Sequence, residues 1–167
     1  MKRKLAIILI FISHLCFLNA QMSLVVNKLY ISHYDVKYIE GKDYEDDEDG
    51  PHIGADCVLK NNSKSDTIEI SPSDSQVYFE FRYKGNIYNQ AVSSLSFREK
   101  DEVLLSPQNS YSFSFGMPIL LGTLIIRSKK QNYTKEIMEI LPTIKVVYKQ
   151  KKMKLISEEI MSVNVGD

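Results

Sequence analysis

The sequence feature that most constrains the fold is a strict alternation of side chains across residues 77–84. One set holds Val77, Phe79, Phe81 and Tyr83, and the other holds Tyr78, Glu80, Arg82 and Lys84. Because successive side chains of a strand point to opposite faces, this period of two predicts a half-buried β-strand. The Gly85-Asn86 pair that follows tolerates positive φ. It predicts a tight turn, with Ile87-Tyr88 returning as the hairpin partner.

Short strands of the same kind are predicted through most of the chain. Residues 53–60 place Ile53, Ala55, Cys57 and Leu59 on one face. Further strand candidates lie at 67–70, 103–105, 111–115, 144–148 and 161–165, separated by polar turn clusters such as 61–66 and 106–109. Many short strands with turn signals between them predict a mainly β fold, a two-sheet antiparallel sandwich.

Two stretches depart from the strand pattern. In residues 134–141, Ile137, Ile140 and Leu141 fall on one helical face, with Thr134 as N-cap and a proline directly after. One short helix is therefore predicted at 134–141. Residues 118–126 are uniformly apolar. Such a run fits a buried strand and a buried helix equally well.

The N-terminus has the order of a secretory signal peptide. Three basic residues at 2–4 precede an apolar run at 5–12, and Leu18-Asn19-Ala20 stands before Gln21. The apolar stretch falls short of the roughly 20 residues that a membrane-spanning helix needs. We expect cleavage after Ala20, export to the periplasm or cell exterior, and no transmembrane segment afterwards. Lipid anchoring at Cys16 is disfavoured because His14-Leu15 precede it instead of small residues.

Removal of the first 20 of 167 residues leaves 147, the length of a single domain at 21–167. Three of the 21 basic residues leave with the signal segment, so 18 face 21 acidic ones, a net charge of −3. Nucleic-acid binders usually carry a basic surplus, so no nucleic-acid partner is expected. Cys57 is then the only cysteine. It is expected in the core, and an intermolecular disulfide is possible only if it is exposed.

The order of turns and strands from Val58 to Phe115 resembles immunoglobulin-like sandwich domains of bacterial exported proteins. The cues are the Asn61-Asn62-Ser63 turn, the aromatic strand, Gly85, and a Pro107 turn into Tyr111-Ser112-Phe113. Within that group the segment is similar to the bacterial proteinase-inhibitor sandwich family. It departs from that family by having Gln108 after Pro107 instead of glycine, and by having no tryptophan. The resemblance implies inhibition of a secreted protease as one possible function.

The acidic run at 43–50 is the most unusual local feature. Glu45, Asp47, Asp49, Gly50 and Asp56 occupy positions 1, 3, 5, 6 and 12 of a calcium-loop pattern. Against a calcium site, Glu45 and Asp56 replace the usual end residues, proline follows the glycine, and strands flank the loop. A solvated acidic loop without a cofactor is therefore the favoured interpretation. The tripeptide Asp66-Thr67-Ile68 resembles an O-glycosylation acceptor, and a turn leading into a strand also explains it.

Two sets of surface side chains are candidates for binding a partner. Tyrosines at 30, 34, 38, 44 and 78 could form a stacking surface for sugars or a protein, or could cover sheet edges. Five lysines at 145, 149, 151, 152 and 154 could contact an anionic glycan, a membrane surface or the acidic loop. They could equally be a solvated hairpin tip that discourages edge pairing.

No arrangement of catalytic residues is evident. After cleavage the histidines are His33 and His52, and neither belongs to a metalloprotease or hydrolase motif. Asp56 and Cys57 should face opposite sides of their strand, which makes them poor ligands for one metal. We therefore expect a non-enzymatic exported module that binds a protein or glycan, or assists assembly, in the cell envelope. A protease inhibitor is the alternative, and an enzyme is the least favoured one.

Calcium should leave the melting temperature of the protein nearly unchanged. If residues 45–56 bound calcium, the stability gain at 100 times the dissociation constant would be about 2.7 kcal/mol, enough to raise the midpoint by a few degrees. Replacing Asp47 and Asp49 by Asn should be neutral or slightly stabilising, since it relieves like-charge repulsion. Thermal unfolding with millimolar calcium or chelator measures both effects, and a calcium-dependent rise that the double substitution abolishes would contradict the expectation.

Overall fold

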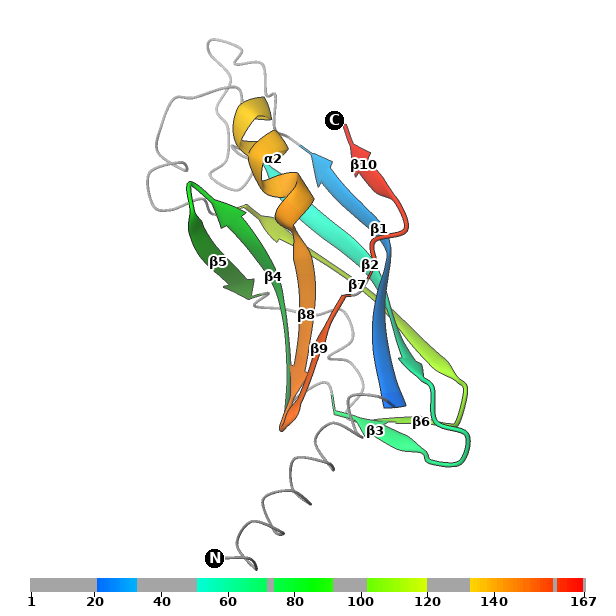
Figure 1. The fold of residues 1–167 in the computed structure, drawn as a ribbon. Helices are drawn as coiled ribbons and strands as arrows, with labels where there is room; N and C mark the ends of the chain where they lie inside the picture. The colour runs from blue at the N-terminus through cyan, green and yellow to red at the C-terminus, as the bar shows by residue number, and fades with distance from the viewer. Residues whose placement is uncertain are drawn as a thin grey trace, which may run out of the picture.

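The computed structural model describes residues 21–32, 51–71, 74–91, 102–119, 133–157 and 159–166. In these residues the chain is mainly β with a short α-helix, which confirms the predicted fold class at that level (Figure 1). The signal segment 1–20, the acidic run 43–50 and most of the apolar stretch, residues 120–126, lie outside them.

The first sheet, sheet I, has the strand order β10-β1-β2-β7. Its strands are β1 (Met22–Ser32), β2 (His52–Asn61), β7 (Ser110–Pro118) and β10 (Val163–Val165). Strand β2 pairs antiparallel with both β1 and β7, whereas β10 runs parallel to β1. Sheet I thus joins the beginning of the described chain to its end.

The second sheet, sheet II, has the order β5-β4-β8-β9 and is antiparallel throughout. Its strands are β4 (Ser75–Tyr83), β5 (Asn86–Ala91), β8 (Lys145–Gln150) and β9 (Met153–Ile156). The β4–β5 hairpin predicted from the sequence is confirmed, but its turn lies one residue earlier than predicted, because Asn86 already pairs with Tyr83. Its turn residues Lys84 and Gly85 have φ of 48° and 79°, the left-handed conformation that such turns require.

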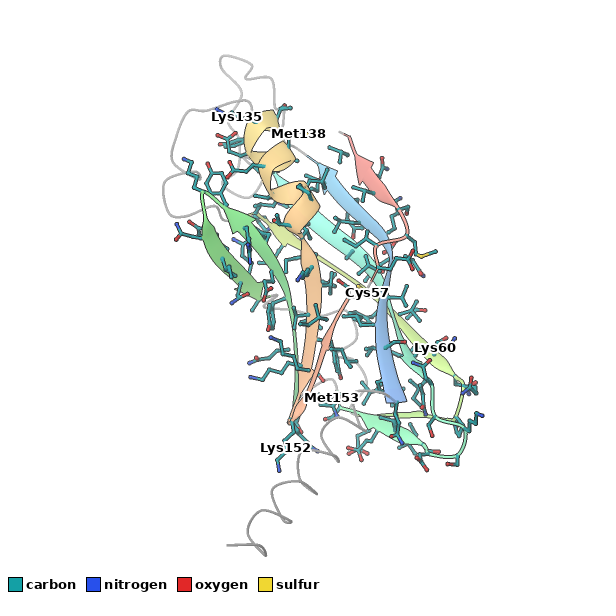
Figure 2. All side chains as sticks on the ribbon, in the orientation of Figure 1. Cys57, Lys60, Lys135, Met138, Lys152 and Met153 are labelled. Atoms are coloured by element: carbon teal, nitrogen blue, oxygen red, sulfur yellow. The ribbon has the colours of Figure 1, made fainter. Side chains whose placement is uncertain are left out.

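The two sheets share one hydrophobic core. On the inward side of β4, Val77, Phe79 and Phe81 are at most 1% exposed. The Phe79 ring lies 4.6 Å from that of Phe115 on β7, which joins the centres of sheets II and I. Cys57 on β2 is buried in the same cluster, as its place in the alternation predicted (Figure 2).

The chain crosses from sheet II to sheet I after β9. Val26 donates its N–H to the carbonyl of Glu159 (3.3 Å) and accepts the N–H of Met161 on its own carbonyl (2.8 Å). Leu29 then donates to the carbonyl of Ser162 (2.9 Å), and the chain continues as β10. One side of the two-sheet stack is therefore closed by continuous main chain (Figure 1).

A two-stranded ribbon, β3 (Ile68–Ile70) with β6 (Val103–Leu105), is held to the sheets by two amide side chains. The fully buried Asn61 donates to the carbonyls of Asp66 (2.7 Å) and Leu105 (2.9 Å). Gln150 donates to the carbonyl of Glu69 (3.1 Å). Buried polar groups are costly unless hydrogen-bonded, so these partners fix the ribbon's position.

The helix α2 (Thr134–Ile140) runs directly into a 3-10 helix, η3 (Leu141–Thr143). Ile137 and Ile140 are buried, as predicted, but the expected cap is wrong. The buried Tyr133 occupies the N-cap position without a side-chain hydrogen bond, so Thr134 is the first helical residue and not the cap. No helix in the described residues is long and apolar enough to span a membrane.

Replacing Phe79 with Ala should lower the free energy of unfolding by about 3–5 kcal/mol, because it leaves a cavity at the contact between the sheets. Replacing Gln76, an exposed residue on the same strand, with Ala should change it by less than about 0.5 kcal/mol. Urea unfolding followed by circular dichroism measures both. Equal effects at the two positions would contradict the assigned faces of β4.

Candidate functional site

Tyr30 lies across a pair of glycines on the outer face of sheet I. Gly54 on β2 is the register partner of both Tyr30 on β1 and Gly116 on β7. A Cβ atom at Gly54 would lie 2.0 Å from the Cε2 atom of Tyr30 and 2.5 Å from its hydroxyl oxygen. A Cβ at Gly116 would lie 3.9 Å from that hydroxyl. The ring therefore reaches from β1 over β2 towards β7 and lies along the sheet.

This arrangement depends on glycine at Gly54. Any other residue there would place a Cβ where the ring now lies, and real Cβ atoms essentially never approach other atoms this closely. Glycine inside a strand normally weakens it, because it has no side chain to pack and more backbone freedom to lose. An aromatic ring laid over the glycine from the next strand restores that contact. Tyr30 thus stabilises the sheet and also presents a partly exposed aromatic ring.

Polar groups stand around the ring on the same face. Asp56 on β2 and Ser114 on β7 are register partners, and the Ser114 hydroxyl donates a 2.7 Å hydrogen bond to the Asp56 carboxylate. Lys28 is the register partner of Asp56 on β1, and Asn164 on β10 is the partner of Tyr30. Tyr30 is thus flanked by a carboxylate, a hydroxyl, an ammonium and an amide. We call Tyr30 with these four residues the tyrosine face.

The surroundings keep Tyr30 protonated. Burial raises the pKa of the Tyr30 phenol, and the Asp56 carboxylate and Cys57 thiol add to the rise. Cys57 itself lies on the core side of β2, only 1% exposed, and burial raises its pKa to about 12. The phenol hydroxyl is therefore available as a neutral hydrogen-bond donor and acceptor. The buried Cys57 is not placed to form an intermolecular disulfide.

An aromatic ring with polar neighbours can bind ligands that have both an apolar face and hydroxyl groups. The electron-rich face of the ring attracts weakly positive C–H groups. The Asp56 carboxylate can accept charge-assisted hydrogen bonds, which are stronger than neutral ones. A sugar ring presents both kinds of group, with C–H bonds on its faces and hydroxyls at its edge.

The residues of the predicted calcium loop are not brought together in the described chain. Glu45, Asp47 and Asp49 lie outside the described residues, and Asp56 sits within β2, where it accepts the hydrogen bond from Ser114. In the described segments, no group of three or more acidic, histidine or cysteine side chains could hold a metal ion. Asp56 and Cys57 do face opposite sides of β2, as the alternation predicted.

The predicted tyrosine surface divides between the two sheets. Tyr34, Tyr38 and Tyr44 lie outside the described residues, as does His33. Tyr30 and Tyr78 belong to different sheets and face opposite sides of the stack, so these two do not form one surface. Gly54, Gly116 and Ser114 were not among the residues predicted from the sequence to have a function. The available signal was an isolated glycine within each strand pattern, which indicates close approach by another group.

No family model matches the sequence, and no curated protein matches it. Among solved structures, one match is the Pseudomonas fluorescens alkylpurine DNA glycosylase AlkC bound to DNA containing an abasic site analog. It has 12% sequence identity and a TM-score of 0.37, and it covers 90% of this chain and 32% of that one. The chain thus spans about a third of that protein, and a likeness at this TM-score carries no argument about activity or ligand.

Two expectations from the sequence are corrected. The expectation that this chain is not an enzyme and the expectation that nucleic acid is not a partner are both withdrawn, and the match, an enzyme bound to DNA, assigns neither property to this chain. Each rested on a premise too weak for an exclusion. The absence of a few known motifs does not exclude other catalytic arrangements, and a net charge averages over the chain whereas binding depends on local charge.

A double-mutant cycle should detect the contact between Tyr30 and Gly54. Replacing Gly54 with Ala in the otherwise unchanged protein should cost about 1–3 kcal/mol of stability, because the new Cβ displaces the ring. In a Tyr30→Ala background the same replacement should stabilise by about 0.5–1 kcal/mol, since alanine loses less backbone freedom than glycine. Urea unfolding of the four variants gives the coupling. Additive effects would mean that the ring does not lie over the glycine.

Proposed function

We propose that the protein is an exported binding module and that the tyrosine face of sheet I holds a sugar ring of a glycan. The observation that carries the proposal is the position of Tyr30 along the sheet above the Gly54–Gly116 pair. A ring fixed in this way loses little freedom when a ligand stacks on it. Binding therefore costs less conformational entropy than it would at a mobile side chain.

The polar neighbours give the proposed site its selectivity. Ser114 donates to Oδ1 of Asp56, which leaves the other carboxylate oxygen of Asp56 to accept from a sugar hydroxyl. Lys28 supplies a donor that suits a hydroxyl or carboxylate oxygen, and the Asn164 amide supplies both a donor and an acceptor. Hydrogen bonds fix the orientation of the sugar while the Tyr30 ring supplies contact area, the usual division of roles in a ligand site.

We further propose that the two sheets form an immunoglobulin-like sandwich. Strand order supports it: β1-β2-β7 correspond to strands A, B and E of that fold, and β5-β4-β8-β9 to C′, C, F and G. Cys57 then occupies an inward position on the B strand. The chain departs from antibody domains by having no tryptophan, and Phe79 fills the core on the strand that corresponds to C.

The proposal places the module in the cell envelope or outside the cell. The support is the order of basic, apolar and small residues in the first 20 positions. Glycans are abundant in that compartment, so a sugar-binding face would meet its ligand there.

A glycan array followed by titration calorimetry with the best-binding oligosaccharide tests the proposed function. Tyr30→Ala should weaken binding about ten-fold or more, since loss of a stacked ring costs on the order of 1–2 kcal/mol. Asp56→Asn should weaken it less, because the amide still accepts a hydrogen bond. Tyr78→Ala, a matched tyrosine replacement on the other sheet, should bind as the unchanged protein does. No glycan binding, or equal losses for the two tyrosines, would falsify the proposal.

A further inference from the structure

Lysines gather on the outer face of sheet II, opposite the tyrosine face. Lys149 on β8 and Lys154 on β9 are direct register partners, and Gln76 on β4 completes their row. Nearer the helix end of the sheet, Lys145 is the partner of Glu80, and Arg82 is exposed one position further along. With one acidic and four basic side chains, this face has a net charge of +3. We call it the lysine face.

The pairing of Lys149 with Lys154 is unfavourable for the folded protein alone. Like charges directly opposite each other on neighbouring strands repel and lower stability. In the described part of the chain, no ion pair involves Lys145, Lys149 or Lys154. The repulsion is therefore not offset by a nearby acidic group among those residues.

A second local cost lies at the tip of the β8–β9 hairpin. Gln150 pairs with Met153, so Lys151 and Lys152 form a two-residue turn. Lys151 has φ of 50°, a conformation that favours asparagine or glycine in such turns. Lys151 and Lys152 thus place two more positive charges in a turn that neutral residues would form more readily. This turn lies at the lower end of the sheet (Figure 2).

The lysine face also has an apolar row. Tyr78, Val147 and Ile156 are neighbours across β4, β8 and β9. Val147 lies on the outward side of β8 by its register and is 0% exposed. Ile156 at one edge of the sheet is 40% exposed, and Ile87 at the other edge is 57% exposed. Aliphatic groups and lysines are therefore presented to the outside together.

We propose that the lysine face docks onto a membrane surface rich in anionic lipid. Charge complementarity requires a negatively charged partner. The exposed Ile87 and Ile156 favour an anionic bilayer over a soluble polyanion. A soluble polysaccharide or nucleic acid would leave both isoleucines in water. The interface of a bilayer accepts aliphatic side chains while its headgroups contact the lysines. The proposal does not rest on glycan binding, since it uses the opposite face of the molecule.

Vesicle sedimentation tests the inference on the chain without residues 1–20. The probes are vesicles of phosphatidylglycerol mixed with phosphatidylcholine, and vesicles of phosphatidylcholine alone, in about 0.1 M salt. We expect the protein to bind the anionic vesicles and not the neutral ones. Each basic residue near an anionic surface contributes about five-fold in affinity, so changing Lys145, Lys149 and Lys154 together to Gln should weaken binding about ten- to a hundred-fold.

The matched control carries the same charge change elsewhere. Lys60, Lys64 and Lys135 are exposed outside sheet II, and Figure 2 labels Lys60 and Lys135. Their triple change to Gln should leave vesicle binding close to that of the unchanged protein. The lysine-face variant should be at least as stable in urea, because the Lys149–Lys154 repulsion is gone. This separates loss of binding from loss of folding.

Three results would overturn the lipid inference. The first is equal loss of binding in the two triple variants, which would mean that only net charge matters. The second is absence of binding to the anionic vesicles, or tighter binding to dextran sulfate or a single-stranded oligonucleotide than to them. The third is loss of vesicle binding in Tyr30→Ala, which would place the contact on the tyrosine face. The glycan titration is independent of all three.

Discussion

The contact between the inward faces of the two sheets is the interaction on which the rest of the structure depends. Phe79 and Phe115 meet at its centre with their rings 4.6 Å apart, and the remaining inward side chains pack around them. Cys57 is a free thiol within the same core, so it gives the described domain no covalent link between the sheets. Packing therefore holds sheet I and sheet II in place, and the position of every outward residue follows from it.

The alternation that builds this core also creates the two outer faces. On β2, Cys57 points inward and Asp56 outward, and on β8 Tyr148 is buried while the neighbouring Lys149 is exposed. The tyrosine face and the lysine face therefore lie on opposite sides of one stack (Figure 1). A molecule docked through the lysines would still present Tyr30 away from the membrane. The two proposed contacts are geometrically compatible, although each is argued from its own residues.

The sequence was sufficient to predict the strands whose alternation is unbroken, such as 77–84 and 53–60. It did not reveal β1, because the register shifts between Val26 and Lys28 and the bulge moves the inward residues from even to odd positions. It also did not reveal the tyrosine face, since the meeting of Tyr30, Gly54 and Gly116 depends on which strands become neighbours. The lysine cluster was visible in the sequence. The β8–β9 register was needed to show that some of these lysines lie on the sheet face and others lie in the turn.

Some residues of this fold occupy positions that their chemistry disfavours, and the structure explains only some of these cases. The buried amides of Asn61 and Gln150 are polar, but each has hydrogen-bond partners that hold the β3–β6 ribbon, so their presence is explained by structure. The Lys149–Lys154 pair, in contrast, is a contact between like charges that no ion pair with an acidic side chain offsets in the described residues. Like-charge repulsion left on one outer face is consistent with a ligand that supplies the missing negative charge, since rule-breaking positions in natural proteins tend to be functional.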